Sequence, residues 1–522
     1  MQLLNKATNI QIYSLIILFL YFSFLSHLAF SIDDGGYMYG AGWRMLSGEK
    51  LYIDYIYARP PVSPYFNALI QYILPDNYEY LNMRRFFYLE IFIYSFLTAH
   101  ILNNKMKEYK IKIDTLTLST IFFIFNAHFN NYMWHTTDGL FFMIISLWII
   151  VMKDNKWTIL SSLMFVLAVG TKQSFYPALI LFPLFIALVK DKKSSIVFAF
   201  FVILWIAILG VTYNKLEQGS IQAWMELSQF ESQTKAIIEA GLVTYIVHFG
   251  ILMIFLGFSM INLTLIEDIR KYMKEKKGEG ALLYIIKYWA RVILILITID
   301  AFLLIFMDSI FPKLMHVFIS GGMVFVFISI IIRMKVNNSQ NFKDDFLLIT
   351  IMFSIAWMSS LSWGYKTPIF YSGIIIYVLI SLSEINISKR KIVSFFFISF
   401  ILVTSILSNR FEKGVNLEFI SEKLKGVYIF EKEKVEDQQR ILDEIEKCNT
   451  DFIVFPSHTY IHYATKTKPV SQLDWISKAE AMNKSDLVQK RLLGSNCLII
   501  EKNYRFKNKN KKFGWNYNIS GY

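Results

Sequence analysis

The first long apolar run of the chain, 10-IQIYSLIILFLYFSFLSHLAFSIDDGG-36, ends directly before two adjacent acids. A bilayer core about 30 Å thick needs roughly 20 apolar residues per helix, so residues 10–31 are predicted to form a membrane span. A cleaved signal peptide is disfavoured, because the run is long and residues 29–31 make a poor cleavage site. Similar apolar runs recur as far as residue 408. The sequence therefore predicts a polytopic α-helical membrane protein.

The composition agrees with a membrane protein and excludes a single soluble domain. Of the 522 residues, 55% are hydrophobic and only 18% are charged, which is too apolar for a soluble chain of this length. The formal net charge of +13 could indicate a nucleic-acid partner. Most Lys and Arg residues lie in short clusters between the apolar runs, so the excess charge is interpreted as membrane topology, with no nucleic-acid partner.

These clusters orient the chain, because loops rich in Lys and Arg face the cytoplasm. They alternate with loops that carry few cations. We predict a transmembrane domain over residues 1–409, with a cytoplasmic N-terminus and a first outer loop over 32–83, and an extracytoplasmic domain over 410–522. The thirteen predicted spans are 10–31, 84–103, 113–128, 138–152, 157–170, 174–189, 194–213, 241–263, 281–306, 314–332, 346–360, 367–383 and 392–408.

Polar residues of the first outer loop have two interpretations. The stretch 33-DDGG-36 precedes a predicted helix over 37–46, so its acids can serve simply as helix caps. Asp54 and 59-RPP-61 follow in the same loop, and Asp138 lies where the fourth span enters the membrane. Asp138 can cap its helix in the same way, with Thr136 and Thr137 sharing this role. Ionisable groups at the membrane edge are costly unless they are paired or face a cavity, so this group is also a candidate functional site.

The order of these residues resembles that of the GT-C glycosyltransferases, in the branch of the protein O-mannosyltransferases and lipid A aminoarabinose transferases. There, an Asp-Glu-Gly-x-Tyr-like segment follows the first span, a basic residue precedes Pro-Pro, and a second Asp opens the fourth span. Here 33-DDGGY-37, 59-RPP-61 and Asp138 hold these places, and 170-GTKQSFYP-177 is similar to the family's Gly-x-Thr-Lys segment. The resemblance covers the transmembrane domain and is strongest over 32–66.

The resemblance implies an enzyme that moves a sugar from a polyprenyl-phosphate carrier to an acceptor hydroxyl outside the cytoplasmic membrane. It implies that Asp33 is the base that deprotonates the hydroxyl, with Asp34 in the place of the family's Glu. Arg59 then holds the donor phosphate, whose negative charge grows as the sugar leaves. Ala58 stands where the lipid A enzymes have Glu, so the donor sugar need not be theirs.

Other residues have weaker assignments. Lys172 is predicted as a second phosphate ligand, and Tyr37, Asp54 and Asp138 as substrate-binding residues. Arg84 and Arg85 are candidates for further phosphate contacts, but for them, as for Lys172, the favoured alternative is a cation that extends from a span end toward the membrane interface. His128 and His135 suggest a metal, but no three ligands stand at a known spacing, so no metal ligand is assigned and a divalent metal cofactor is left open.

The last part of the chain is predicted to be a small α/β domain with partly parallel strands. Apolar stretches at 426–430, 452–456 and 497–502 are typical of buried strands, with helices expected between them. Cys448 and Cys497 both lie here and could form a disulfide or remain free thiols.

The predicted function is therefore that of a membrane glycosyltransferase with a polyprenyl-phosphate sugar as donor and surrounding membrane lipid as partner. The acceptor could belong to a protein, a lipid or a polysaccharide. The alternative is a polytopic transporter or a flippase for lipid-linked glycans, which would need polar, broken helices near the membrane midplane. The predicted acids instead gather at one membrane face, which favours the enzyme.

Overall fold

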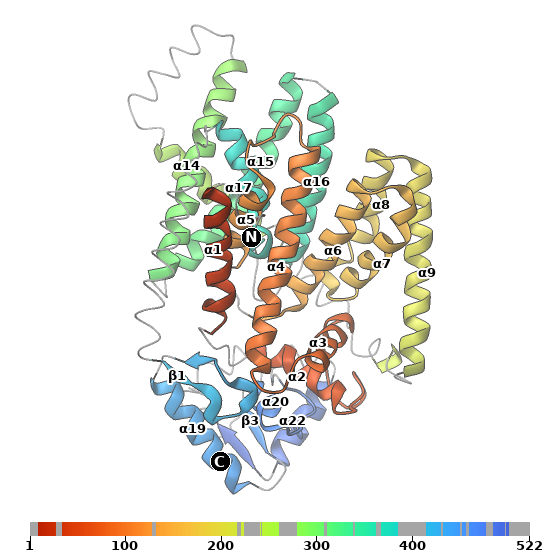
Figure 1. Ribbon diagram of the computed structural model, residues 1–522, viewed down its shortest axis with the longest axis vertical. Coiled ribbons are helices and arrows are strands. Elements are labelled where there is room, and N and C mark those ends of the chain that lie inside the picture. The colour runs from red at the N-terminus through yellow and green to blue at the C-terminus, as the bar shows by residue number, and fades with distance from the viewer. Residues whose placement is uncertain are drawn as a thin grey trace.

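The computed structural model describes residues 9–27, 34–127, 132–216, 221–223, 241, 243–259, 279–306, 311–337, 340–361, 367–384, 414–429, 432–448, 452–455, 459–474, 476, 484–495 and 497–500. Long helices form a bundle, and a smaller mixed region lies at one end of it (Figure 1). Asp33 and the predicted span 392–408 lie outside the described residues.

The bundle is built from apolar helices whose bounds follow the predicted spans. Each of the first twelve predicted spans overlaps one helix, because a continuous apolar segment satisfies its own backbone polar groups only as a helix within a bilayer. The helices are α1 (Asn9–Ser23), α4 (Glu79–Lys105), α5 (Thr115–Ala127), α6 (His135–Met152), α7 (Thr158–Val169), α8 (Ala178–Val189), α9 (Lys192–Leu216), α12 (Thr244–Ser259), α14 (Glu279–Phe306), α15 (Phe311–Asn337), α16 (Gln340–Ser360) and α17 (Gly373–Ser383).

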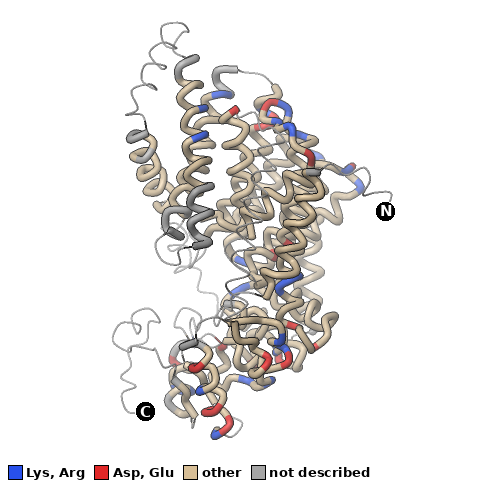
Figure 2. Tube along the Cα trace, turned by 60° about the vertical axis from the view of Figure 1, so that its left-hand side comes forward, with Lys and Arg blue, Asp and Glu red and all other residues tan. Residues whose placement is uncertain are grey.

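The bundle has the properties of a membrane domain. Within the described part of the chain, five helical segments are long and apolar enough to cross a bilayer: 10–27, 79–105, 135–152, 192–215 and 316–333. Charged residues gather toward the two ends of the bundle and are sparse along its middle (Figure 2). The chain is thus a helical membrane protein, as the composition predicts.

Two further helices lie across the end of the bundle, where the first outer loop was predicted. They are α2 (Asp34–Leu46), which confirms the helix predicted over 37–46, and α3 (Val62–Ile73). The two helices pack tightly at Gly42, where an added Cβ would stand 2.9 Å from the Ala68 backbone nitrogen. Gly48 follows α2 with a φ of +82°, a left-handed conformation that favours glycine at this turn.

The mixed region, residues 414–500, contains the predicted strands in two separate pairs. Strands β1 (Val415–Asn416) and β2 (Tyr428–Ile429) are antiparallel, whereas β3 (Ile453–Phe455) and β4 (Leu498–Ile500) are parallel with Ile453 opposite Leu498. The expected parallel pairing is therefore confirmed for 452–456 with 497–502, but 426–430 pairs elsewhere. The helices of this region are α19 (Lys432–Lys447), α20 (Tyr460–Thr465) and α22 (Ser485–Leu493).

Covalent and polar contacts hold this region together and fix it to the bundle. Cys448 and Cys497 form a disulfide, which decides between the two states that the sequence left open. Helix α20 packs on α2, and the buried Arg44 of α2 pairs with Asp474 at 3.3 Å and with Glu49 at 2.6 Å.

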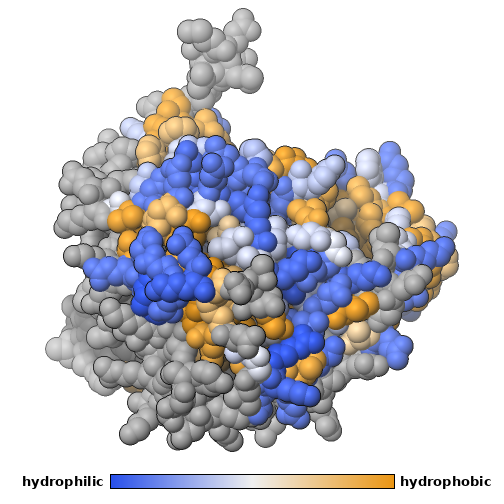
Figure 3. Space-filling view, turned by 90° about the horizontal axis from the view of Figure 1, so that it is seen from below, coloured by the Kyte–Doolittle hydropathy of each residue, from blue (hydrophilic) through white to orange (hydrophobic). Residues whose placement is uncertain are grey.

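The molecule seen from below, at the end that carries the mixed region, is largely hydrophilic over its described residues, with hydrophobic patches between (Figure 3).

Candidate functional site

Three segments that are distant in the sequence meet at the first turn of α6. The Val62 N–H donates to the Gly170 carbonyl at 3.0 Å, and the Gln173 side chain donates to the Ala58 carbonyl at 3.0 Å. The turn after α7 also packs on α6 at Gly139, where an added Cβ would stand 2.5 Å from Thr171 Oγ1. These contacts bring the 59-RPP-61 segment and the Gly-x-Thr-Lys segment to the same helix end.

Two of the predicted phosphate ligands come together here. Lys172 is 6% exposed, and its ammonium donates to Thr136 Oγ1 at 2.9 Å. Burial, followed by repulsion from Arg59, lowers the pKa of Lys172 to about 7 from an ordinary 10.5. A helix N-terminus adds partial positive charge and free backbone N–H groups. Arg59, Lys172 and the start of α6 therefore form a largely buried cationic site, suited to a phosphate.

The burial of Lys172 can be tested through the pH dependence of protein stability. At pH 6 the lysine is protonated in the folded and the unfolded chain, so the folded state carries the full cost of a buried charge. That cost shrinks as the pH rises from about 7 toward 10.5, where the unfolded chain also loses the proton. Lys172→Met should thus raise the melting temperature most at pH 6 and least near pH 10.5. A gain that does not vary with pH, measured by thermal unfolding in detergent, would contradict this account.

Aromatic side chains form one wall beside the cations. The buried Tyr37 ring stacks on Tyr57 with centroids 5.4 Å apart and an interplanar angle of 14°, and it lies 6.5 Å from the Trp134 ring. The Arg59 guanidinium lies 5.6 Å from the centre of the Tyr37 ring and donates to its hydroxyl at 3.5 Å. Tyr37 thus positions Arg59 through a cation–π contact.

Of the two predicted catalytic acids, only Asp34 lies within the described residues, at the start of α2. Asp33 lies outside them, and the side chain of Asp34 is not described. The next residue, Gly35, packs so closely that an added Cβ would stand 2.5 Å from Tyr80 Oη and 3.3 Å from the Tyr132 ring. Because Tyr132 comes just before α6, the first turn of α2 approaches the start of α6, where Arg59 and Lys172 lie.

The cap predicted for α6 is confirmed for Thr137 and wrong for Asp138. Thr137 takes the capping role: its hydroxyl accepts from the Trp134 N–H at 3.1 Å and donates to the Trp134 carbonyl at 2.8 Å. Asp138 lies inside the first turn and is fully buried. Within the described part of the chain, its carboxylate oxygens have no hydrogen-bond partner. The buried Ser63 hydroxyl likewise has no hydrogen-bond partner among the described residues.

A second buried acid, Glu90 of α4, faces Asp138 and was missed in the sequence. Its carboxylate is also fully buried, lacks a hydrogen-bond partner among the described residues, and interacts electrostatically with Asp138. Both ring nitrogens of the buried His135 are likewise without a described partner. Buried polar groups are normally paired, so this group is a candidate for binding or proton transfer. The signal that could have found Glu90 is a lone acid inside an apolar span.

Other predicted residues have different surroundings. Asp54 accepts a hydrogen bond from the Lys50 N–H at 2.7 Å and closes a turn, so its role in substrate binding stays a prediction. Arg84 was expected at the membrane interface, which is wrong: it is fully buried, donates to the Ser26 carbonyl at 3.0 Å and lies over the Tyr80 ring. Arg85 contacts Asn82 and His27.

The described residues include no group of three His, Cys, Asp or Glu side chains placed to hold a metal ion.

No protein-family model matches the chain, and no curated protein is significantly similar to it. The site must therefore be interpreted from its own geometry and chemistry.

Proposed function

We propose that this chain is an integral-membrane glycosyltransferase that moves a sugar from a polyprenyl phosphate to an acceptor hydroxyl on the outer side of the cytoplasmic membrane. The observation that carries the proposal is the meeting of Arg59, Lys172 and the start of α6 in one largely buried cationic site. Such a site suits a lipid phosphate, because it offers fixed positive charge away from bulk water.

The reaction needs a base, an acceptor and a stabilised leaving group. Asp33, with Asp34 beside it, takes the proton of the acceptor hydroxyl. The hydroxyl oxygen forms the new bond to the anomeric carbon while the bond from that carbon to the phosphate oxygen breaks, and the phosphate leaves with the electron pair. Arg59 and Lys172 stabilise its growing charge. Tyr37 positions Arg59, and Asp138 contributes to holding the sugar or the acceptor.

The proposed topology is a GT-C-like domain of thirteen spans with a cytoplasmic N-terminus and an extracytoplasmic region after residue 410. The Cys448–Cys497 disulfide supports an outer location for that region, because disulfides persist in oxidising compartments. Its packing on α2 supports a common side for the first outer loop and the C-terminal region. Donor, acceptor and acids would then meet at the outer membrane face.

Binding of the lipid phosphate tests the cationic site. Purified protein in detergent should bind polyprenyl phosphate in native mass spectrometry, and Arg59→Ala should weaken that binding at least tenfold, about 1.4 kcal/mol, because the most weakly hydrated cation is lost. Lys156→Ala is the matched control, since this exposed lysine lies beyond the site. Equal binding of uncharged polyprenol, or unchanged binding by Arg59→Ala, would remove the main support for the proposal.

A transporter or a flippase for lipid-linked glycans is the second candidate. The observation that favours it is the buried pair of Glu90 and Asp138 between α4 and α6, since acids inside spanning helices often carry protons in transporters. The two candidates differ in what they do to the glycan. A transferase forms a new glycosidic bond, whereas a flippase changes only the side of the membrane on which its lipid-linked glycan lies.

A further inference from the structure

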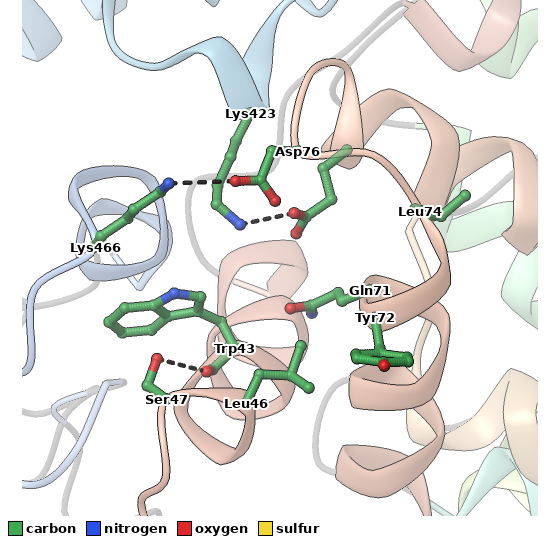
Figure 4. Close-up of a pocket in the computed structure, with 10 residues that line it drawn as sticks. Trp43, Leu46, Ser47, Gln71, Tyr72, Leu74, Asp76, Lys423 and Lys466 are labelled. Carbon is green, nitrogen blue, oxygen red and sulfur yellow. Dashed lines mark hydrogen bonds and ion pairs between the residues drawn. The ribbon is translucent and has the colours of Figure 1, made fainter.

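A concave site separate from Arg59 and Lys172 lies between the first outer loop and the C-terminal region. It is a pocket of about 340 Å³ formed by the end of α2, the end of α3, the start of α4 and two lysines of the C-terminal region. Figure 4 shows Trp43 on one side of it and Gln71 and Tyr72 on the other. Its volume falls within the range of small-molecule sites, about 300 to 1,000 Å³.

The charges around the pocket cancel in pairs. Lys423 binds Glu79 at 2.7 Å, and both side chains are buried; Lys466 binds Asp76 at 3.3 Å, and both are exposed. Glu79 also accepts from the Tyr463 hydroxyl at 2.5 Å, which fixes the buried pair further. Two cations and two acids leave no net charge in the lining, so the pocket has no preference for an anion such as a phosphate.

The remaining lining offers aromatic side chains, with the buried Gln71 behind them. Tyr72 is 78% exposed and presents its ring at the surface, whereas Trp43 is 9% exposed. Gln71 is 4% exposed; its amide nitrogen donates to the Tyr39 carbonyl at 2.9 Å, which leaves its carbonyl oxygen without a partner among the described residues. In Figure 4 this amide points toward Trp43.

We propose that this pocket binds a neutral saccharide unit of the acceptor. The apolar C–H face of a sugar ring packs on aromatic side chains, and its hydroxyls need polar partners such as the exposed Asp76 and Lys466. Binding of a saccharide does not depend on the proposed function. The assignment of that saccharide to the acceptor does rest on it. Asp34 and Trp43 stand nine residues apart on α2, which is about 14 Å along a helix. An acceptor seated in the pocket would therefore be a glycan of more than one sugar.

Saturation-transfer NMR on the purified full-length protein tests the pocket without a donor. The probes are maltotriose, cellotriose and chitotriose, with a trimer of galacturonic acid as the anionic counterpart. At least one neutral trimer should bind, and its signal should fall at least fivefold in Tyr72→Ala, whose exposed side chain is safe to remove for folding. Trp157→Ala is the matched control, because this exposed aromatic residue lies outside the pocket lining.

Three results would overturn the inference: no binding of any neutral trimer, binding unchanged in Tyr72→Ala, or a preference for the anionic trimer. The third would indicate a site for an acidic ligand. Because the assay needs no sugar transfer, its outcome is separate from that of the enzyme. If the wild-type protein binds a neutral trimer at this pocket but transfers no sugar, the saccharide site is supported and the proposed function is refuted.

Discussion

Replacing Asp33 by Asn is expected to lower the rate of sugar transfer by about 10²- to 10⁴-fold, the usual contribution of a positioned general base. The amide has nearly the shape of the carboxylate but cannot accept the hydroxyl proton. In the sequence, Asp33 directly precedes α2. The first turn of α2 packs against Tyr80 and Tyr132, beside the start of α6. The assay is transfer of label from polyprenyl-phosphate sugars in membranes that carry each variant at equal abundance.

Two matched variants make this result specific. Asp34→Asn tests whether the neighbouring acid shares the work, and a smaller loss than in Asp33→Asn assigns the proton to Asp33. The control Asp191→Asn alters a carboxylate that has no part in the proposed site, one that accepts from the Ser194 N–H at 2.7 Å at the start of α9. It should keep most of the activity. Full activity in Asp33→Asn would show that Asp33 is not the general base and would leave helix capping as its role.

Glu90→Gln is expected to stabilise the folded protein by about 1–3 kcal/mol at alkaline pH, where the wild-type chain would bury an ionised carboxylate without a described hydrogen-bond partner. The wild-type chain buries two interacting carboxylates, Glu90 and Asp138, without described hydrogen-bond partners. At alkaline pH, where both acids ionise, replacing one by its amide removes their repulsion and part of the cost of burying charge. Natural proteins accept such costs at functional sites, so the stabilised variant should also lose activity.

Thermal unfolding in detergent measures this change, and Asp138→Asn should behave in the same way. The double variant should gain less than the sum of the two single gains, because each substitution alone already removes the repulsion. A matched control is Glu49→Gln, which removes an acid that pairs with Arg44 and should therefore destabilise the protein. Loss of stability in Glu90→Gln would mean that the carboxylate has a stabilising partner beyond the residues described.

Local sequence patterns predicted the parts of the fold that depend on local physics. The helices over 37–46 and 138–152 were expected because capping residues and continuous apolar runs act within a few residues. Arg84 was misplaced because α4 begins at Glu79, five residues before the predicted span, which carries Arg84 inside the helix. There its guanidinium is buried and donates to the Ser26 carbonyl instead of extending outward from the helix.

The candidate site was predictable only in part. Arg59 and Lys172 were found through their motifs, and the structure brings both to α6. Glu90 was missed because it lies within 86-FFYLEIFIYSF-96, and only the packing of α4 on α6 places it opposite Asp138. The pocket joins Trp43, Tyr72 and Lys423 across nearly 400 residues of sequence. No local pattern connects such distant side chains.

The most direct test of the proposed function is the structure of the product in cells. Surface glycans and glycoproteins would be compared by mass spectrometry between cells that lack this protein and cells rescued with wild type, Asp33→Asn or Arg59→Ala. We expect one sugar substituent to disappear and to return only with wild type, while both variants reach the membrane at wild-type abundance. Full rescue by Asp33→Asn would contradict the proposed function and favour the transporter.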